Sequence, residues 1–155
     1  MAELKPILLV EDSPKDVELT LAALERCQLA NAVIVTRDGA EALDYLHARG
    51  KFTNRTTGDP AVVLLDLKLP KVDGLEVLED IKKDPRLRHT PVVMLTSSRE
   101  ERDLVRSYQL GVNAFVVKPV GFEQFFEAIQ DLGMFWAVLN EPPPPRARLR
   151  SEHAA

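Results

Sequence analysis

The stretch that decides the fold is Ala61-Val-Val-Leu-Leu-Asp66-Leu-Lys-Leu-Pro-Lys-Val-Asp73-Gly74. Its first five residues are all apolar and do not alternate with polar residues. This pattern predicts a strand that is covered on both faces, as in the middle of a parallel sheet. Asp66 ends the strand. Because ligands of open α/β sheets bind at the carboxyl ends of the strands, Asp66 is a candidate for chemistry.

An alternative role for Asp66 is to cap the helix that follows the strand. Asp73 already suits that role, because Glu76 stands three residues after it and the two form a capping box. Asp66 is therefore not needed as a cap, although a polar residue at a strand end can also simply complete a turn. The spacing favours a functional role.

Four more short apolar runs lie before and after this strand, and each is followed by a segment with helical spacing. The expected strands are 7–10, 32–35, 61–65, 91–95 and 114–117, and the expected helices are about 14–27, 38–48, 73–83, 98–110 and 122–139. This alternation requires a parallel sheet with helices on both faces. We expect a flavodoxin-like (βα)5 α/β fold, a doubly wound parallel sheet with the strand order 2-1-3-4-5.

The first helix has a clear start. Ser13 is expected to cap it, with Pro14 at its first position. Val17, Leu21 and Leu24 are expected along one side of it, with Ala22 and Ala23 broadening the apolar face.

Composition bounds the class of protein. The 155 residues are 45% hydrophobic, which fits one globular domain, expected at residues 1–140. The net charge of −4 gives no reason to expect a nucleic acid or an anionic membrane as a partner. No apolar run is long enough for a signal peptide or a membrane span, so we expect a cytoplasmic protein.

Residues 141–155 contain four consecutive prolines and three arginines, and they are expected to form a disordered tail. The arginines could contact an acidic partner or membrane headgroups, but a solvated tail is favoured.

The expected strand order brings the carboxyl ends of four strands together. These ends carry Glu11 and Asp12, Asp66, Thr96, and Lys118. Three carboxylates close together repel one another, and without a counter-charge at least one of them would have a raised pKa. A divalent cation resolves this conflict. With oxygen ligands and no histidine or cysteine at these strand ends, Mg²⁺ is favoured over zinc.

A lysine and a hydroxyl beside such a metal suit a phosphoryl group, because both can bond its oxygens during transfer. An aspartate can itself be the nucleophile and form an acyl phosphate. The alternative is purely structural, with Lys118 in a salt bridge to spare acids at the sheet edge. One such pair would be ordinary, whereas a convergent set from four strands favours phosphoryl transfer.

The sequence resembles the receiver domain of two-component response regulators over nearly all of residues 6–139. The resemblance rests on a set of short motifs: Glu11-Asp12, Asp66, Leu69-Pro70 with Asp73-Gly74, Thr96-Ser97, and Lys118-Pro119. It implies that Asp66 accepts phosphate from a histidine kinase and that Asp12 and Asp66 ligate Mg²⁺. Glu11 would assist through water, and the backbone carbonyl of Lys68 would be the remaining protein ligand.

The resemblance also implies roles around the phosphoryl group. Thr96 and Lys118 would bind its oxygens, and the small Ser97 would leave the site accessible. The Lys118–Pro119 bond is expected to be cis. Phe115 matches the switch aromatic that turns inward when Thr96 moves toward the phosphoryl group. Because it is phenylalanine and not tyrosine, a contact through a hydroxyl is not expected.

A second resemblance is to the small stand-alone regulators that serve phytochrome-type kinases. It rests on the polar loop at 50–60, the segment at 110–115 and the pair Phe135-Trp136. We expect no output domain after Leu139, so the signal would pass through a partner, a change in association or phosphate flow.

Two classes of function are compatible with the sequence: a switch that takes up phosphate, and an interaction module of the same shape that does not. The filled site positions favour the switch. No G-x-G-x-x-G motif points to a dinucleotide enzyme.

A homodimer is expected through the face formed by the fourth helix, the fifth strand and the fifth helix. The fifth helix has an apolar stripe for the sheet, and Phe135 lies beside it. Leu104 and Tyr108, one turn apart on the fourth helix, could complete an apolar patch that a monomer would rarely expose. The alternative is that the last helix simply wraps the edge of the core.

Overall fold

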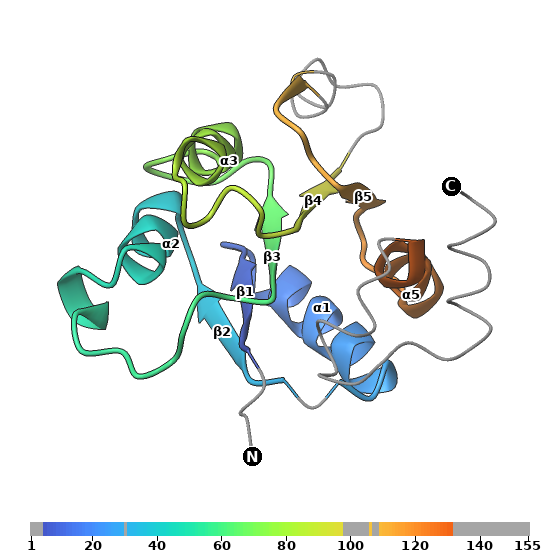
Figure 1. The fold of residues 1–155 in the computed structure, drawn as a ribbon. Coiled ribbons are helices and arrows are strands. Elements are labelled where there is room, and N and C mark those ends of the chain that lie inside the picture. Colours follow the sequence, from blue (N-terminus) through green and yellow to red (C-terminus); the bar gives the residue numbers. More distant parts are fainter. Residues whose placement is uncertain (1–4, 30, 98–105, 107–108, 132–155) are drawn as a thin grey trace, which may run out of the picture.

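A computed structural model describes residues 5–29, 31–97, 106 and 109–131. Its sheet has five parallel strands in the order β2-β1-β3-β4-β5, as predicted (Figure 1). The strands are β1 (Ile7–Val10), β2 (Val33–Thr36), β3 (Val62–Asp66), β4 (Val92–Thr96) and β5 (Ala114–Val117). The central position of β3 explains its unbroken apolar run, because all five of its residues are buried.

Helices cover both faces of the sheet. They are α1 (Pro14–Arg26), α2 (Gly39–Leu46), α3 (Gly74–Lys83) and α5 (Phe122–Asp131), with a short 3-10 helix η1 (Gly50–Phe52). In Figure 1, α1 and α5 lie on one side of the sheet, and α2 and α3 lie on the other. Most of the expected fourth helix, and residues 132–139 of the expected fifth, lie outside the described residues. Within the described part of the chain, no helix is both long and apolar enough to cross a bilayer.

The core consists of two clusters, one on each face. Ile7 and Leu9 of β1 join the cluster under α1 and α5, whereas Leu8 and Val10 join the cluster under α2 and α3. Successive strand residues therefore need apolar neighbours on opposite faces, which is why the strands show no alternation.

The expected caps of α1 and α3 are confirmed. The backbone N–H of Asp16 donates to Ser13 Oγ at 3.3 Å, and that of Glu76 donates to Asp73 Oδ1 at 2.9 Å. Because Asp73 starts α3, Asp66 is not used as a cap, as the sequence indicated.

The predicted apolar side of α1 was partly wrong. Leu21 is 37% exposed and Ala22 is also exposed, whereas the buried residues of the helix are Val17, Thr20, Ala23 and Leu24. At about 100° per residue, these four positions define a face centred near Thr20, and Leu21 lies to one side of it. The rotation of the helix is set by its packing against α5 and the sheet.

Candidate metal centre

The strand register builds the site at the carboxyl edge of the sheet. Val10 pairs with Leu65 and Asp66 pairs with Leu95, so Glu11 follows β1 beside the end of β3. Thr96 pairs with Val117, so Lys118 comes directly after that pair at the end of β5. Residues that are more than a hundred positions apart in the sequence thus meet at one edge, as predicted.

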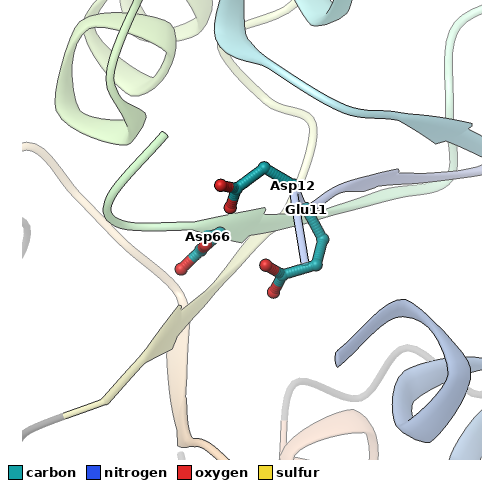
Figure 2. A group of neighbouring side chains, drawn as sticks. All are labelled: Glu11, Asp12 and Asp66. Carbon is teal, nitrogen blue, oxygen red and sulfur yellow. The ribbon is translucent and has the colours of Figure 1, made fainter. Parts of the chain in front are cut away.

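Three carboxylates form a compact group at this edge. Glu11, Asp12 and Asp66 each offer an oxygen, and these oxygens all lie within 4.8 Å of one another. Figure 2 shows the three side chains where the ends of β1 and β3 lie side by side. Asp12 is exposed, whereas Asp66 is 4% exposed and Glu11 is fully buried. The group therefore has two buried acids and one that faces solvent.

Lys118 lies against this acidic group. Its Nζ is 3.2 Å from Asp66 Oδ1 and 3.2 Å from Glu11 Oε1. A third oxygen, Oδ2 of Asp16 in the first turn of α1, also lies at 3.2 Å. Asp16 was not predicted as part of the site, because it lies within a helix and not at the end of a strand. The available signal was its position four residues after Asp12, in the helix that starts beside the site.

The start of α1 also orients Glu11. The backbone N–H of Ser13 donates to Glu11 Oε2 at 3.3 Å, while Glu11 Oε1 accepts from Lys118. Each carboxylate oxygen of Glu11 thus accepts a hydrogen bond, and these two bonds fix the orientation of the buried side chain.

The turn after β3 keeps Asp66 in place. The N–H of Leu67 donates to Leu95 O at 3.0 Å, and the N–H of Gly74 donates to Leu67 O at 3.0 Å. Gly74 lies so close to β3 that a Cβ on it would be 2.3 Å from the carbonyl oxygen of Asp66. Only glycine fits this approach. Lys68 lies exposed in the same turn.

Thr96 and Phe115 belong to β4 and β5, which lie on the side of β3 away from β1. Thr96 is buried at the end of β4, and its carbonyl accepts from the Lys118 N–H at 2.6 Å. The Lys118–Pro119 bond is cis, as the resemblance implied. Phe115 is partly buried and packs against the core cluster under α2 and α3. Leu104, Tyr108 and Phe135 lie outside the described residues.

Residues 7–130 match the family model of the response regulator receiver domain. The chain belongs to this family. It is 41% identical over 132 residues to the response regulator Rcp1 of Synechocystis sp., covering 85% of this chain and 88% of Rcp1.

Solved structures of response regulators agree with this assignment. The bacteriophytochrome response regulator AtBRR matches with a TM-score of 0.81 at 76% identity, over 90% of this chain and 100% of AtBRR. The Mn²⁺-bound form of Rcp1 matches with a TM-score of 0.72 at 39% identity, over 90% of this chain and 99% of Rcp1. The phosphorylated cyanobacterial phytochrome response regulator RcpA matches with a TM-score of 0.72 at 41% identity, over 86% and 94%. This chain is thus a receiver domain similar to phytochrome response regulators.

The pKa values at this site show that Lys118 does not fully compensate the charges of the buried carboxylates. Burial, then the charge of Asp66 and a hydrogen bond to it, raise the pKa of Glu11 from 4.5 to about 7. Burial also raises the pKa of Asp66, although Lys118 opposes the shift. Burial alone would lower the pKa of Lys118, but the charges of Asp66 and Glu11 outweigh it and raise that pKa. One ammonium therefore does not balance the carboxylates around it.

The residues present fit a divalent metal. Within the described part of the chain, the group that could hold it consists of the carboxylates of Glu11, Asp12 and Asp66, and hard oxygen ligands suit Mg²⁺. The cofactor of the site is Mg²⁺, as in receiver domains generally, and the solved Mn²⁺-bound form of Rcp1 holds an ion of the same charge.

Proposed function

We propose that the chain is a phosphorylatable signalling switch of the cytoplasm, in which Asp66 accepts a phosphoryl group from a histidine kinase of the phytochrome type. The observation that carries the proposal is the placement of Asp66: a buried carboxylate at the end of the central strand, 3.2 Å from Lys118 and within the group of three carboxylates. All the positions that phosphoryl transfer needs are filled, which favours the switch over an interaction module without phosphate chemistry.

The proposed reaction takes place at the Asp66 carboxylate. One oxygen attacks the phosphorus of the donor, the bond from phosphorus to the donor nitrogen breaks, and an acyl phosphate forms on Asp66. Lys118 and Thr96 bind the oxygens of the phosphoryl group as charge shifts during transfer. In this proposal the protein promotes its own phosphorylation and dephosphorylation and has no other substrate.

The proposed metal ligands are Asp12 and Asp66, with Glu11 acting through water and the backbone carbonyl of Lys68 completing the protein's share. Mg²⁺ usually keeps open positions for water and a phosphate oxygen, so when bound it would neutralise charge on the transferring group. The exposure of Asp12 beside two buried acids supports this arrangement, because it leaves one side of the group open to solvent.

The choice of a phytochrome-type kinase rests on the similar proteins. AtBRR is a bacteriophytochrome response regulator, and RcpA is a phosphorylated phytochrome response regulator. We further propose that residues 1–140 form the receiver domain and 141–155 a tail. The signal would leave through a partner or through a homodimer of the face that includes Leu104, Tyr108 and Phe135. Movement of Thr96 and Phe115 on phosphorylation would change the affinity or the geometry of association through that face.

The test is labelling with a small-molecule phosphodonor such as phosphoramidate. We expect the wild type to become phosphorylated in the presence of Mg²⁺ and to remain unlabelled when the metal is chelated. Asp66→Asn keeps the shape of the side chain but removes the nucleophile, so it should take up no label. Glu18→Gln, at an exposed acid of α1, is the control and should label like the wild type. Undiminished labelling of Asp66→Asn would refute the assignment.

A further inference from the structure

The ammonium group of Lys118 has three N–H bonds and, among the residues that the structure describes, three carboxylate neighbours. Its Nζ lies 3.2 Å from an oxygen of Glu11, of Asp66 and of Asp16. Glu11 and Asp66 end strands of the sheet, whereas Asp16 belongs to α1 and is 102 positions away from Lys118 in the sequence. The contact therefore joins the first turn of α1 to the end of β5 across the site.

Asp16 differs from the other two partners of Lys118 because it is not a member of the carboxylate group that could hold a metal. Glu11 and Asp66 belong to the group of carboxylates that fits the metal, so they would interact with a second cation when the metal is bound. Asp16 lies outside that group, and its carboxylate contacts Lys118. Metal binding would therefore not compete with the contact between Asp16 and the Lys118 ammonium.

The setting of Asp16 suits this task. Its side chain is 24% exposed and that of Lys118 is 15% exposed, so the pair is largely removed from water. Its backbone is fixed by the hydrogen bond to Ser13 Oγ that starts α1. A lysine side chain has four flexible carbons, and a fixed carboxylate at its tip removes much of that freedom.

We propose that Asp16 is a positioning residue, which holds the Lys118 ammonium beside Asp66 so that it is in place when the phosphoryl group binds. This inference rests on the proposed function, because the benefit of positioning Lys118 is its contact with phosphoryl oxygens. An uncharged Asn at this position keeps the shape and one hydrogen-bond acceptor but loses the charge. Lys118 would then be drawn less strongly to its place.

A purely structural role must be separated from this one. An acid in the first turn of a helix also stabilises the helix through its dipole, and Asp16→Asn would remove that contribution too. A measurement of stability alone therefore does not distinguish a positioning role of Asp16 from a purely structural one. The informative quantity is the affinity for beryllofluoride, which mimics a phosphoryl group on an aspartate, compared with the affinity for Mg²⁺ alone.

The experiment measures both affinities by calorimetry, with beryllofluoride added at saturating Mg²⁺. For Asp16→Asn we expect beryllofluoride to bind about tenfold more weakly, the size expected for a lost charge-assisted hydrogen bond. Mg²⁺ should bind within about threefold of the wild type, because Asp16 is not a proposed ligand. Asp16→Glu retains the charge and should recover part of the loss, and Glu18→Gln should bind as the wild type does. Asp16→Ser removes the same charge and replaces Asp16→Asn if that variant does not fold.

The Lys118→Gln background completes the design. If Asp16 acts through Lys118, adding Asp16→Asn to Lys118→Gln should cause no further loss of beryllofluoride affinity. The inference is overturned if Asp16→Asn binds beryllofluoride as tightly as Glu18→Gln, or if it costs as much in the Lys118→Gln background as in the wild type. Failure of the wild type itself to bind beryllofluoride or to take up phosphate would instead overturn the proposed function, and this inference with it.

Discussion

Glu11 is a buried acid that the metal-free protein holds at an electrostatic cost. Its pKa in the folded state is about 7, against an ordinary value of 4.5, so between these values the folded chain retains a proton that the unfolded chain releases. The contribution of Glu11 to stability is therefore fully present below pH 4.5 and is lost as the pH rises through about 7. Asp66, whose pKa is also raised, acts in the same direction.

We therefore predict that the metal-free protein becomes less stable as the pH rises from about 5 to about 8. Urea unfolding in the presence of a chelator measures this change, and Glu11→Gln should make it clearly smaller because glutamine does not titrate. Added Mg²⁺ should restore most of the stability at the higher pH. An equal loss of stability in Glu11→Gln and the wild type would contradict this origin.

Asp12 is predicted to matter for the metal and not for folding. It is exposed, so Asp12→Ala should leave the chain folded, and it should slightly raise metal-free stability because the charge of Asp12 raises the pKa of Asp66. The affinity of Asp12→Ala for Mg²⁺ should be at least about tenfold lower than that of the wild type. Even the loss of a residue that only hydrogen-bonds a metal ligand lowers the affinity by about that much. Calorimetric titration measures the affinity, with Glu25→Gln at an exposed acid as the control. Identical affinities in the wild type and Asp12→Ala would refute the role.

At the residue scale, the sequence predicted the acidic group because each of its members lies at the end of a strand or directly after it. Glu11, Asp12, Asp66 and Lys118 could be placed together from the strand order alone, and the structure brings them together. Asp16 could not be found this way. It is part of a helix, and its contact with Lys118 depends on the angle at which α1 leaves β1.

Among the elements, the turn between β3 and α3 leaves no room for a side chain at Gly74. A Cβ on Gly74 would lie 2.3 Å from Asp66 O and 2.8 Å from Leu67 O, both of which are backbone atoms. An alanine at position 74 therefore has to push the end of β3 or the start of α3 away, which moves Asp66.

We predict that Gly74→Ala destabilises the protein by about 1–3 kcal/mol, the range for overpacking, and slows phosphorylation. Gly58→Ala is a matched control, because a Cβ there has no neighbour within 4 Å. It should change stability by less than about 0.5 kcal/mol. Urea unfolding and phosphodonor labelling of both variants measure the two effects. Equal unfolding midpoints and labelling rates for the two variants would show that the contact is relieved without cost.

Element boundaries and types were largely predictable because their signals are local. The caps at Ser13 and Asp73 and the unbroken apolar runs of the inner strands depend on a few neighbouring residues. The buried face of α1 could not be predicted from such local signals. Thr20 is buried and Leu21 is exposed because of how the helix packs. The short helix η1 was missed in a segment that composition indicated as a loop.

At the scale of the whole molecule, the fold could be predicted because five strands that alternate with helices leave few arrangements. Two core clusters, one on each face of the sheet, confirm that arrangement. Leu104, Tyr108 and Phe135 of the expected dimer face lie outside the described residues, so the dimer remains a prediction.

We predict that the wild type forms a homodimer whose affinity changes on phosphorylation. Phe135→Asp and Tyr108→Asp place a charge in the expected apolar patch and should shift the protein toward monomer in sedimentation experiments. Leu21→Asp makes the same kind of change at an exposed apolar residue of α1 and should leave association unchanged. A wild type that stays monomeric at concentrations on the order of tens of micromolar, with and without phosphodonor, would rule the dimer out.

The most direct test of the proposed switch is to locate the phosphoryl group on the chain. After phosphorylation in the presence of Mg²⁺, borohydride reduces an aspartyl phosphate to homoserine, and peptide mass spectrometry then identifies the altered residue. The proposal predicts one modified position, Asp66, in the peptide that contains the end of β3. Modification at Asp12 or another acid with Asp66 unchanged, or no modification at all, would contradict it.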